Sequence, residues 1–148
     1  MAEEQRVVSA SLVIEAPAET IWELIVEPVN QPSWDGNDNL GQAEPGQRVQ
    51  AVGDVFRMTL SGGAVRDNHV VEYDEGRRIA WRPSEVDRPP FGHLWRWELA
   101  PQDDGSTLVT HTYDWTQLTD ETRFPRARAT QHENLMASLE RLAGLATT

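Results

Sequence analysis

The chain has 148 residues, a length typical of one folded domain, and we expect that domain to span residues 1–148. Its 24 acidic side chains outnumber its 13 basic ones and give a formal net charge of −11, which predicts no binding to nucleic acid. The absence of cysteine excludes disulfides, thiolate nucleophiles and cysteine-ligated zinc. The opening MAEEQRVV lacks the pattern of a signal peptide, and no apolar run reaches about 18 residues. We therefore expect a cytoplasmic protein with no membrane insertion.

The N-terminal part predicts one strand followed by two short helices. Residues 6–15 alternate apolar and polar side chains, which is the period of a half-buried strand. Pro17 suits the first turn of a helix, because its missing N–H needs no helical partner there. Apolar residues then follow at helical spacing up to Pro28, namely Ile21, Leu24 and Ile25. A second helical turn is predicted over residues 29–34.

From about residue 40 onward, turn signals recur at regular intervals. Glycine-containing turns are expected at residues 61–63, 74–76 and 103–105, between segments rich in β-branched and aromatic residues. These segments predict strands over residues 53–60, 65–73, 77–84, 91–100 and 106–115. Gly46 and Gly53 bound a further, weaker strand. Consecutive strands joined by short turns form an antiparallel meander.

The C-terminal part changes to a helical pattern. Thr119 is a predicted helix cap followed by the first-turn acids Asp120 and Glu121, and Pro125 either starts the main helix or kinks a longer one. One face of this helix of roughly 20 residues carries Ala129, His132, Leu135, Met136, Leu139, Leu142 and Ala143. The opposite face carries Arg128, Gln131, Asn134, Ser138 and Arg141. Together with the preceding strands, this order predicts an α+β fold.

These features resemble a known superfamily. The segment SLVIEAPAETIWELIVEP, the pair Trp34–Asp35, the meander with HTYDW and the long final helix are similar to the SRPBCC superfamily. These START-like, helix-grip proteins include polyketide cyclases/dehydrases and lipid-transport proteins, and the resemblance covers essentially the full chain. It implies a curved seven-stranded antiparallel sheet wrapped around a long C-terminal helix, with two short helices after the first strand. It also implies an apolar cavity between the sheet and that helix.

Strand periodicity predicts which side chains face the cavity. Charged residues belong in water, so the faces opposite Arg57, Arg82 and Arg96 should point inward. From these faces and from the apolar side of the last helix, the predicted ligand-binding residues are Phe56, Met58, His69, Val71, Trp81, His93, Trp95, Trp97, His111, Tyr113, His132, Leu135, Met136 and Leu139. Aromatic walls with a few polar groups are typical of small-molecule sites. The alternative is that these rings simply fill the core.

Three of these side chains are candidate catalytic groups. His111 and Tyr113 share one predicted strand, and His93 lies on its expected neighbour. A histidine could then remove a proton next to a carbonyl group while the tyrosine polarises the carbonyl oxygen. The alternative is that all three are buried polar side chains with ordinary hydrogen-bond partners. The histidine spacings match no zinc motif, so we expect no metal site and no cofactor.

Two further segments allow two interpretations each. Trp34 and Gly36 could belong to a lid at the mouth of the cavity, with Gly36 as its hinge, or to a turn anchored by a buried tryptophan. The pair Arg126 and Arg128 could bind an anion, but we expect short basic pairs in an acidic protein to be solvated charges.

Three functional hypotheses follow. The leading one is a protein that binds a hydrophobic or aromatic small molecule, lipid-like or polyketide-like, in an internal cavity between sheet and C-terminal helix. The second is a polyketide cyclase, aromatase or dehydratase that uses the cavity histidines and tyrosine as acid and base. The third is a protein-interaction module, which would present an exposed apolar patch instead of a cavity. A homodimer is compatible with each hypothesis.

Overall fold

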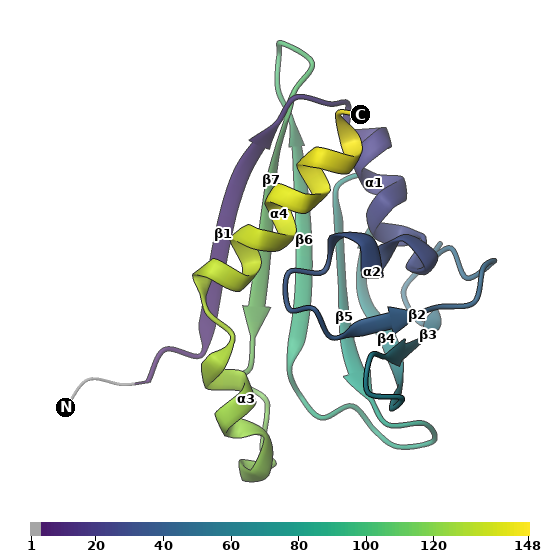
Figure 1. Ribbon diagram of the computed structural model, residues 1–148, viewed down its shortest axis with the longest axis vertical. Helices are drawn as coiled ribbons and strands as arrows, with labels where there is room; N and C mark the ends of the chain where they lie inside the picture. Colours follow the sequence, from purple (N-terminus) through teal and green to yellow (C-terminus); the bar gives the residue numbers. More distant parts are fainter. Residues whose placement is uncertain (1–3) are drawn as a thin grey trace.

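A seven-stranded antiparallel sheet forms the body of the protein (Figure 1). The computed structural model describes residues 4–148, so residues 1–3 of the predicted domain lie outside the described part. The strands are β1 (Val7–Ile14), β2 (Leu40–Gln42), β3 (Val55–Leu60), β4 (Val65–Asp74), β5 (Arg78–Ser84), β6 (Leu94–Pro101) and β7 (Thr107–Asp114). Their spatial order is β1-β7-β6-β5-β4-β3-β2, so β2 to β7 form a meander and β1 closes onto β7.

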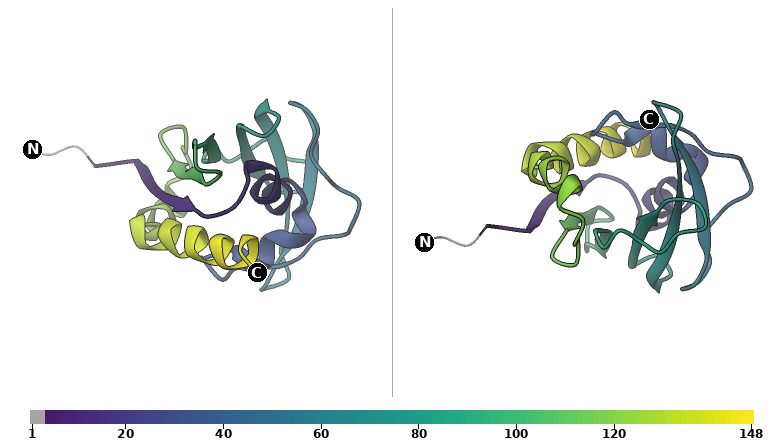
Figure 2. Two further views of the ribbon diagram at one scale, coloured as in Figure 1. Left: turned by 90° about the horizontal axis from the view of Figure 1, so that it is seen from above. Right: turned by 90° about the horizontal axis from the view of Figure 1, so that it is seen from below.

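The helices lie between β1 and β2 and after β7. Helix α1 (Ala18–Val26), the 3₁₀ turn η1 (Pro28–Asn30) and helix α2 (Gln31–Trp34) follow the first strand. The 3₁₀ turn η2 (Glu121–Arg123) and helices α3 (Phe124–Ala129) and α4 (His132–Ala146) end the chain. Helix α4 crosses in front of β1, β7 and β6 (Figure 1), and the end-on views show the sheet curving with α4 on its concave side (Figure 2). The α+β helix-grip fold predicted from the sequence is confirmed.

The core lies between α4, α1 and the concave face of the sheet. Leu135, Leu139 and Leu142 of α4 are fully buried, as are Ile21 and Ile25 of α1. Helix α4 packs mainly against β1 and also touches α1. Full burial of such a side chain contributes roughly 1.5–3 kcal/mol. This apolar seam therefore fixes where α4 lies relative to the sheet.

One expected strand is absent and an unexpected one takes its place at the sheet edge. Residues 46–53 form no strand, and Val49 is the buried residue of this segment, with its N–H donating to the Val26 carbonyl at 3.0 Å. The edge strand β2 lies further upstream and pairs with β3. The glycines that suggested strand boundaries are instead parts of the loop between β2 and β3.

The single C-terminal helix expected from the sequence is broken in two. Helix α3 ends at Ala129, and Thr130 and Gln131 adopt extended backbone before α4 begins at His132. Gln131 caps α4, with its backbone N–H donating to Asn134 Oδ1 at 2.9 Å. Because His132 is the first residue of the new helix, it is exposed rather than part of an apolar stripe. Its predicted place in the cavity is wrong.

Candidate functional site

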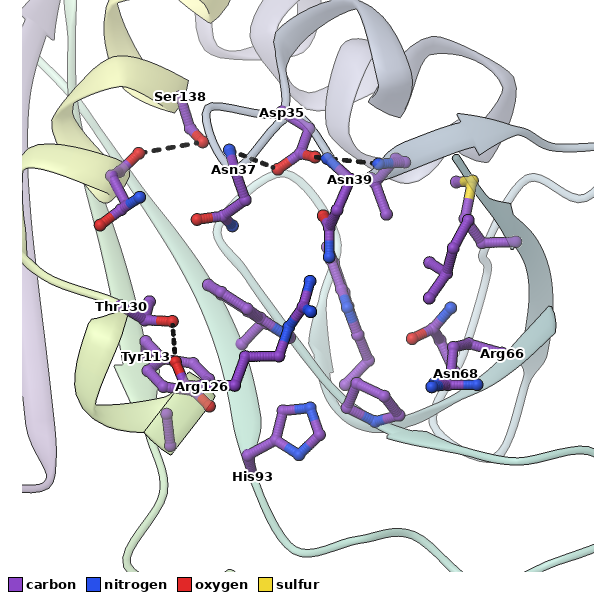
Figure 3. A pocket seen from close by; sticks show the side chains of 18 of the residues that line it. Asp35, Asn37, Asn39, Arg66, Asn68, His93, Tyr113, Arg126, Thr130 and Ser138 are labelled. Carbon is purple, nitrogen blue, oxygen red and sulfur yellow. Dashed lines mark hydrogen bonds between the residues drawn. The ribbon is translucent and has the colours of Figure 1, made fainter. Parts of the chain in front are cut away.

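A pocket of about 370 Å³ lies between the concave face of the sheet and helices α2, α3 and α4. Strands β3 to β7 supply one wall, and the turn after α2 together with α3 and α4 supplies the other. In Figure 3, His93 lies at the end of the pocket away from Asp35, and Asn68 of β4 lies across from Tyr113 of β7. The volume falls within the range of about 300–1,000 Å³ typical of small-molecule sites.

Two cross-strand rows of rings form the sheet wall of the pocket. Trp81, Trp95 and Tyr113 are register partners on β5, β6 and β7, and Trp97 pairs with His111 in the next row. The Trp95 and Tyr113 ring centroids are 4.3 Å apart, and Trp97 stacks on His111 at 3.7 Å. Cross-strand partners on one face lie close enough for such packing. Both Trp95 and Trp97 therefore face the pocket, as the strand period predicts.

His111 is a fixed and uncharged side chain. It is 3% exposed, and its Nδ1 lies 3.0 Å from the Arg96 carbonyl oxygen. Because a carbonyl oxygen only accepts, the proton lies on Nδ1, which donates it. Burial lowers the pKa of His111 to about 4, while the hydrogen bond to Arg96 acts in the opposite direction. An imidazole with this pKa is neutral at pH 7 and is a weak general base.

His93 and Tyr113 face each other within the pocket, edge to face, with ring centroids 5.9 Å apart. Burial, and then the positive charges of nearby arginines with Arg123 foremost, lowers the pKa of His93 to about 4. Burial also raises the pKa of Tyr113 to about 12. Both rings are therefore uncharged near pH 7. They offer hydrogen bonds to a ligand rather than an acid and a base with pKa values near neutrality.

The turn after α2 is organised by the buried carboxylate of Asp35. Its oxygens accept hydrogen bonds from the backbone N–H groups of Asn37, Asn39 and Leu40 at 3.0, 3.0 and 3.2 Å. These bonds close the loop around one side chain, as Asx turns do. Because these bonds occupy the carboxylate oxygens, Asp35 has a structural role although it lines the pocket.

Gly36 and Trp34 anchor this turn rather than hinge it. The Gly36 N–H donates to Ser138 Oγ at 2.8 Å, and a Cβ at residue 36 would lie 2.5 Å from the Asn134 carbonyl oxygen. Trp34 is buried, and its Nε1 donates to the Leu24 carbonyl at 2.7 Å. The hinge role expected for Gly36 is therefore wrong, because glycine is needed there for close approach to α4. The structure fits the alternative interpretation, a turn anchored by a buried tryptophan.

Three buried side-chain polar atoms have no hydrogen-bond partner within residues 4–148. They are His93 Nδ1, Trp97 Nε1 and Arg123 Nε. All three belong to residues that line the pocket. Since buried polar groups are normally paired, these atoms could each bond a ligand that comes within reach. In the described part of the chain, no three histidine, aspartate or glutamate side chains gather as metal ligands, and no helix has the length and apolarity needed to cross a membrane.

Comparison with known families adds to this geometry. Residues 5–147 match the family model described as polyketide cyclase/dehydrase and lipid transport. The chain belongs to this family. A search among curated proteins found no match to the sequence.

Several solved structures share the fold of this chain. A Nitrosomonas europaea protein matches with a TM-score of 0.73 at 16% identity, over 99% of this chain and 97% of that one. A START superfamily protein from Mycobacterium smegmatis matches with a TM-score of 0.66 at 17% identity, over 95% and 97%. The Aha1 dimer from Colwellia psychrerythraea matches with a TM-score of 0.63 at 18% identity, over 95% of each chain. Identities this low show the fold alone.

The structure brings half of the predicted ligand-binding residues to the pocket of this family member. Those that line it are Met58, Trp81, His93, Trp95, Trp97, His111 and Tyr113. Four others belong to the core or pack against it instead, namely Phe56, Leu135, Met136 and Leu139. Phe56 faces inward as expected but is covered by Trp81, with ring centroids 5.2 Å apart. The apolar stripe of α4 meets β1 and α1, so the predicted cavity role of its leucines and methionine is wrong.

His69 and Val71 point away from the pocket, and the binding role predicted for them is wrong. Asn68 and Val70 are the buried residues in this part of β4, whereas Val71 is 38% exposed. The register between β4 and β5 shifts just after Val70. The extra residue of such a bulge inverts the alternation of faces, which is why Tyr73 nevertheless packs against the core.

Sequence reasoning missed the polar side of the pocket. Its residues come from β4, from the loop before β6 and from the last three helical elements, and they include Arg66, Asn68, Phe91, Arg123, Arg126, Asn134 and Ser138. Asn134 and Ser138 are four positions apart, so they share a helical stripe next to the buried leucines. That spacing was a usable signal. Arg126 was considered as part of an anion-binding pair but was expected to be solvated, and nothing in the local pattern marked Arg66 or Arg123.

Proposed function

We propose that this protein binds a compact, aromatic or otherwise hydrophobic small molecule in the pocket between the sheet and helices α3 and α4. The observation that carries the proposal is the pocket itself, with a volume of about 370 Å³ and a wall of tryptophan rings. Membership in a family described by polyketide cyclisation and lipid transport agrees with it. The volume lies near the lower end of the usual range for such sites, which favours one compact molecule.

The wall chemistry supports a ligand with a flat apolar body. Trp81, Trp95 and Trp97 are held by register partners on neighbouring strands, so their rings are fixed before a ligand arrives. Trp34 packs edge-on against Trp97 at 5.1 Å and limits its movement. Rigid rings bind flat molecules by offset or edge-to-face packing at little cost in side-chain entropy. The neutral His93 can then orient the ligand through hydrogen bonds.

Binding is tested with N-phenyl-naphthylamine, a neutral aromatic probe that fluoresces in apolar surroundings. We expect wild-type protein to enhance its emission with a saturable dependence and to transfer energy from tryptophan, because Trp34, Trp81, Trp95 and Trp97 line the pocket. Ala127→Phe fills the pocket from within, and Ala129→Trp covers its exposed rim. Each variant should weaken probe binding at least about tenfold by removing buried contact area.

Ala64→Trp is the matched control. Ala64 is exposed in the turn between β3 and β4 and does not line the pocket, so this variant adds a tryptophan without blocking anything. It should bind the probe as the wild type does. The exposed position of Ala129 keeps the comparison usable if the buried Ala127→Phe variant fails to fold. Absence of saturable binding by the wild type, or equal binding by both blocked variants, would contradict the proposal.

A cyclase-type or dehydratase-type enzyme is the second candidate, supported by the position of His93 and Tyr113 in the pocket. Their uncharged forms can donate hydrogen bonds to a carbonyl oxygen, which is how such sites stabilise developing charge. Under this hypothesis, the small molecule extracted from wild-type protein would differ from that extracted from the H93Q/Y113F double variant, in mass if water is lost and in chromatographic retention if a ring closes without loss of atoms. Recovery of the same molecule from both proteins would favour binding without chemistry.

A further inference from the structure

We propose that the ligand is an organic acid whose carboxylate, or an equivalent anionic headgroup, is bound by Arg66, Arg123 and Arg126 while its aromatic body lies on the tryptophan wall. This inference rests on the proposed function and adds the chemical class of the ligand. It is argued from the positions, the hydrogen-bond and ion-pair partners and the local charge of these three arginines, which all lie at one end of the pocket.

The three arginines reach the pocket from different elements. Arg66 lies on β4, Arg123 in η2 and Arg126 on α3, and all three line the pocket. The guanidinium carbons of Arg66 and Arg123 lie 5.4 and 3.4 Å from the centroid of the Phe91 ring. In Figure 3, Arg126 approaches from the helical side and Arg66 from the strand side, with His93 beneath them. One small anionic group could therefore contact more than one guanidinium.

Protein carboxylates leave these arginines weakly paired. In residues 4–148, neither Arg66 nor Arg126 forms an ion pair with an aspartate or glutamate. Arg123 lies 3.7 Å from both Glu85 and Asp120, whose side chains are 57% and 50% exposed. Such long and exposed pairs contribute about 1 kcal/mol at most. Arg123 Nε is also buried without a hydrogen-bond partner in the described range.

The one acidic side chain among the described lining residues is already engaged. Asp35 accepts three backbone hydrogen bonds, and the Asn39 amide, oriented to satisfy both neighbours, donates to Asp35 Oδ2 at 3.0 Å. The Asn39 amide oxygen accepts from Arg126 Nη2 at 2.6 Å, so Arg126 meets an amide rather than a carboxylate. Three arginines thus face one occupied carboxylate, in a chain whose net charge is −11. The residues that line the pocket therefore carry a net positive charge, whereas the protein as a whole is negative.

Neighbouring ionisable groups respond to this local positive charge. After burial, the causes that lower the pKa of His93 are the charges of Arg123, Arg66, Arg82 and Arg126. The pKa of Arg66 is itself lowered, first by burial and then by the charges of Arg123 and Arg126, while the charge of Glu85 acts in the opposite direction. Like charges held together in a partly buried site repel each other more strongly than in water. A bound anion would offset that repulsion, whereas a neutral ligand would leave it in place.

The arginine end is continuous with the aromatic wall. Phe91 stacks beside His93 with centroids 5.9 Å apart, and His93 meets Tyr113, which packs on Trp95. A ligand can therefore place an anionic head among the guanidinium groups while its rings follow this row. Guanidinium groups bind carboxylates through paired, charge-assisted hydrogen bonds, which makes arginine suited to this recognition.

The test compares two competitors of equal size for the N-phenyl-naphthylamine site. Naphthoate carries a carboxylate, and naphthalenemethanol is its neutral counterpart. We expect naphthoate to displace the probe from wild-type protein at a concentration at least about tenfold lower, at low ionic strength. Arg66→Gln and Arg126→Gln should each reduce this preference, and the double variant, in which only Arg123 remains, should reduce it further. Arg77→Gln removes the same charge from an exposed site outside the pocket and should leave the preference unchanged.

The outcomes separate this inference from the proposed function. If the probe binds but the two competitors displace it equally well, the pocket is a binding site and the anionic headgroup is refuted. If the double variant keeps the full preference of the wild type, Arg66 and Arg126 do not bind the headgroup, and the inference is likewise refuted. If the probe does not bind wild-type protein, the proposed function fails and the inference fails with it. Probe affinity of each arginine variant shows whether its pocket remains folded.

Discussion

Buried His111 should make the stability of the protein fall as the pH is lowered below neutrality. Its pKa is about 4 in the folded protein, against about 6.5 for an ordinary histidine, because burial penalises the charged ring. Between these values the unfolded chain binds a proton that the folded protein does not. Stability contributed by the neutral ring is therefore fully present above pH 6.5 and is lost progressively as the pH falls toward 4.

The size of the effect follows from the two pKa values. Between pH 7 and pH 5 the difference in proton binding at His111 amounts to about 2 kcal/mol of unfolding free energy. Measurements can stop at about pH 5, since the isoelectric point of 4.7 lies just below it and would favour aggregation. Because His111 is 3% exposed, little solvent screening reduces this figure.

Urea unfolding followed by tryptophan fluorescence measures the effect. His111→Gln keeps an amide that can donate to the Arg96 carbonyl but cannot titrate in this range. The stability difference between wild type and this variant should shrink by about 2 kcal/mol from pH 7 to pH 5. Thr107→Val is the matched control, because it removes a buried hydrogen bond from the same strand without removing a titratable group. A wild-type–variant difference that stays constant with pH would refute the reasoning.

Two further predictions concern the turn after α2 and the arginine end of the pocket. Gly36→Ala should lower the unfolding free energy by about 1–3 kcal/mol, because the added methyl group meets the backbone of α4; Gly62→Ala, where a Cβ meets nothing within 4 Å, should be close to neutral in the same urea titration. Naphthoate should raise the pKa of His93 above about 4, because the anion offsets the arginine charges, but not to its ordinary value, because burial remains. The His93 pKa is measured from the pH dependence of its ring NMR signals, with and without naphthoate. An unchanged pKa on saturation with naphthoate would contradict the second prediction.

The fold was accessible from the sequence because its elements carry strong local signals. Strand periodicity placed Trp95 and Trp97 inward, and glycine turns separated the strands of the meander. The same rule failed at His69, since one bulge residue inverts a strand and leaves no mark in composition. Helical periodicity failed at His132, because the break between α3 and α4 depends on a cap at Gln131 rather than on a proline or glycine.

The polar pocket residues were less accessible for a different reason. Arg66 and Arg126 come together only in the folded sheet and helices, since they lie on separate elements far apart in the chain. Arg126 is exposed, as its local pattern predicts, but it also lines the pocket, which that pattern does not show. The aromatic wall can thus be predicted from the sequence of single strands, whereas the arginine cluster depends on how separate elements come together in the fold.

The polar groups around the pocket divide by whether the protein already uses them. His111 donates to a carbonyl, Asp35 holds its turn, and Ser138 accepts from Gly36, so these groups have little bonding capacity left for a ligand. His93 Nδ1 and Arg123 Nε are buried without partners within the described residues. Of the three unpaired side-chain atoms, Trp97 Nε1 belongs to the aromatic wall and the other two lie at the arginine end, where Glu85 and Asp120 pair only weakly with Arg123. This asymmetry should orient any ligand with its polar head among the arginines and its apolar body toward Trp97.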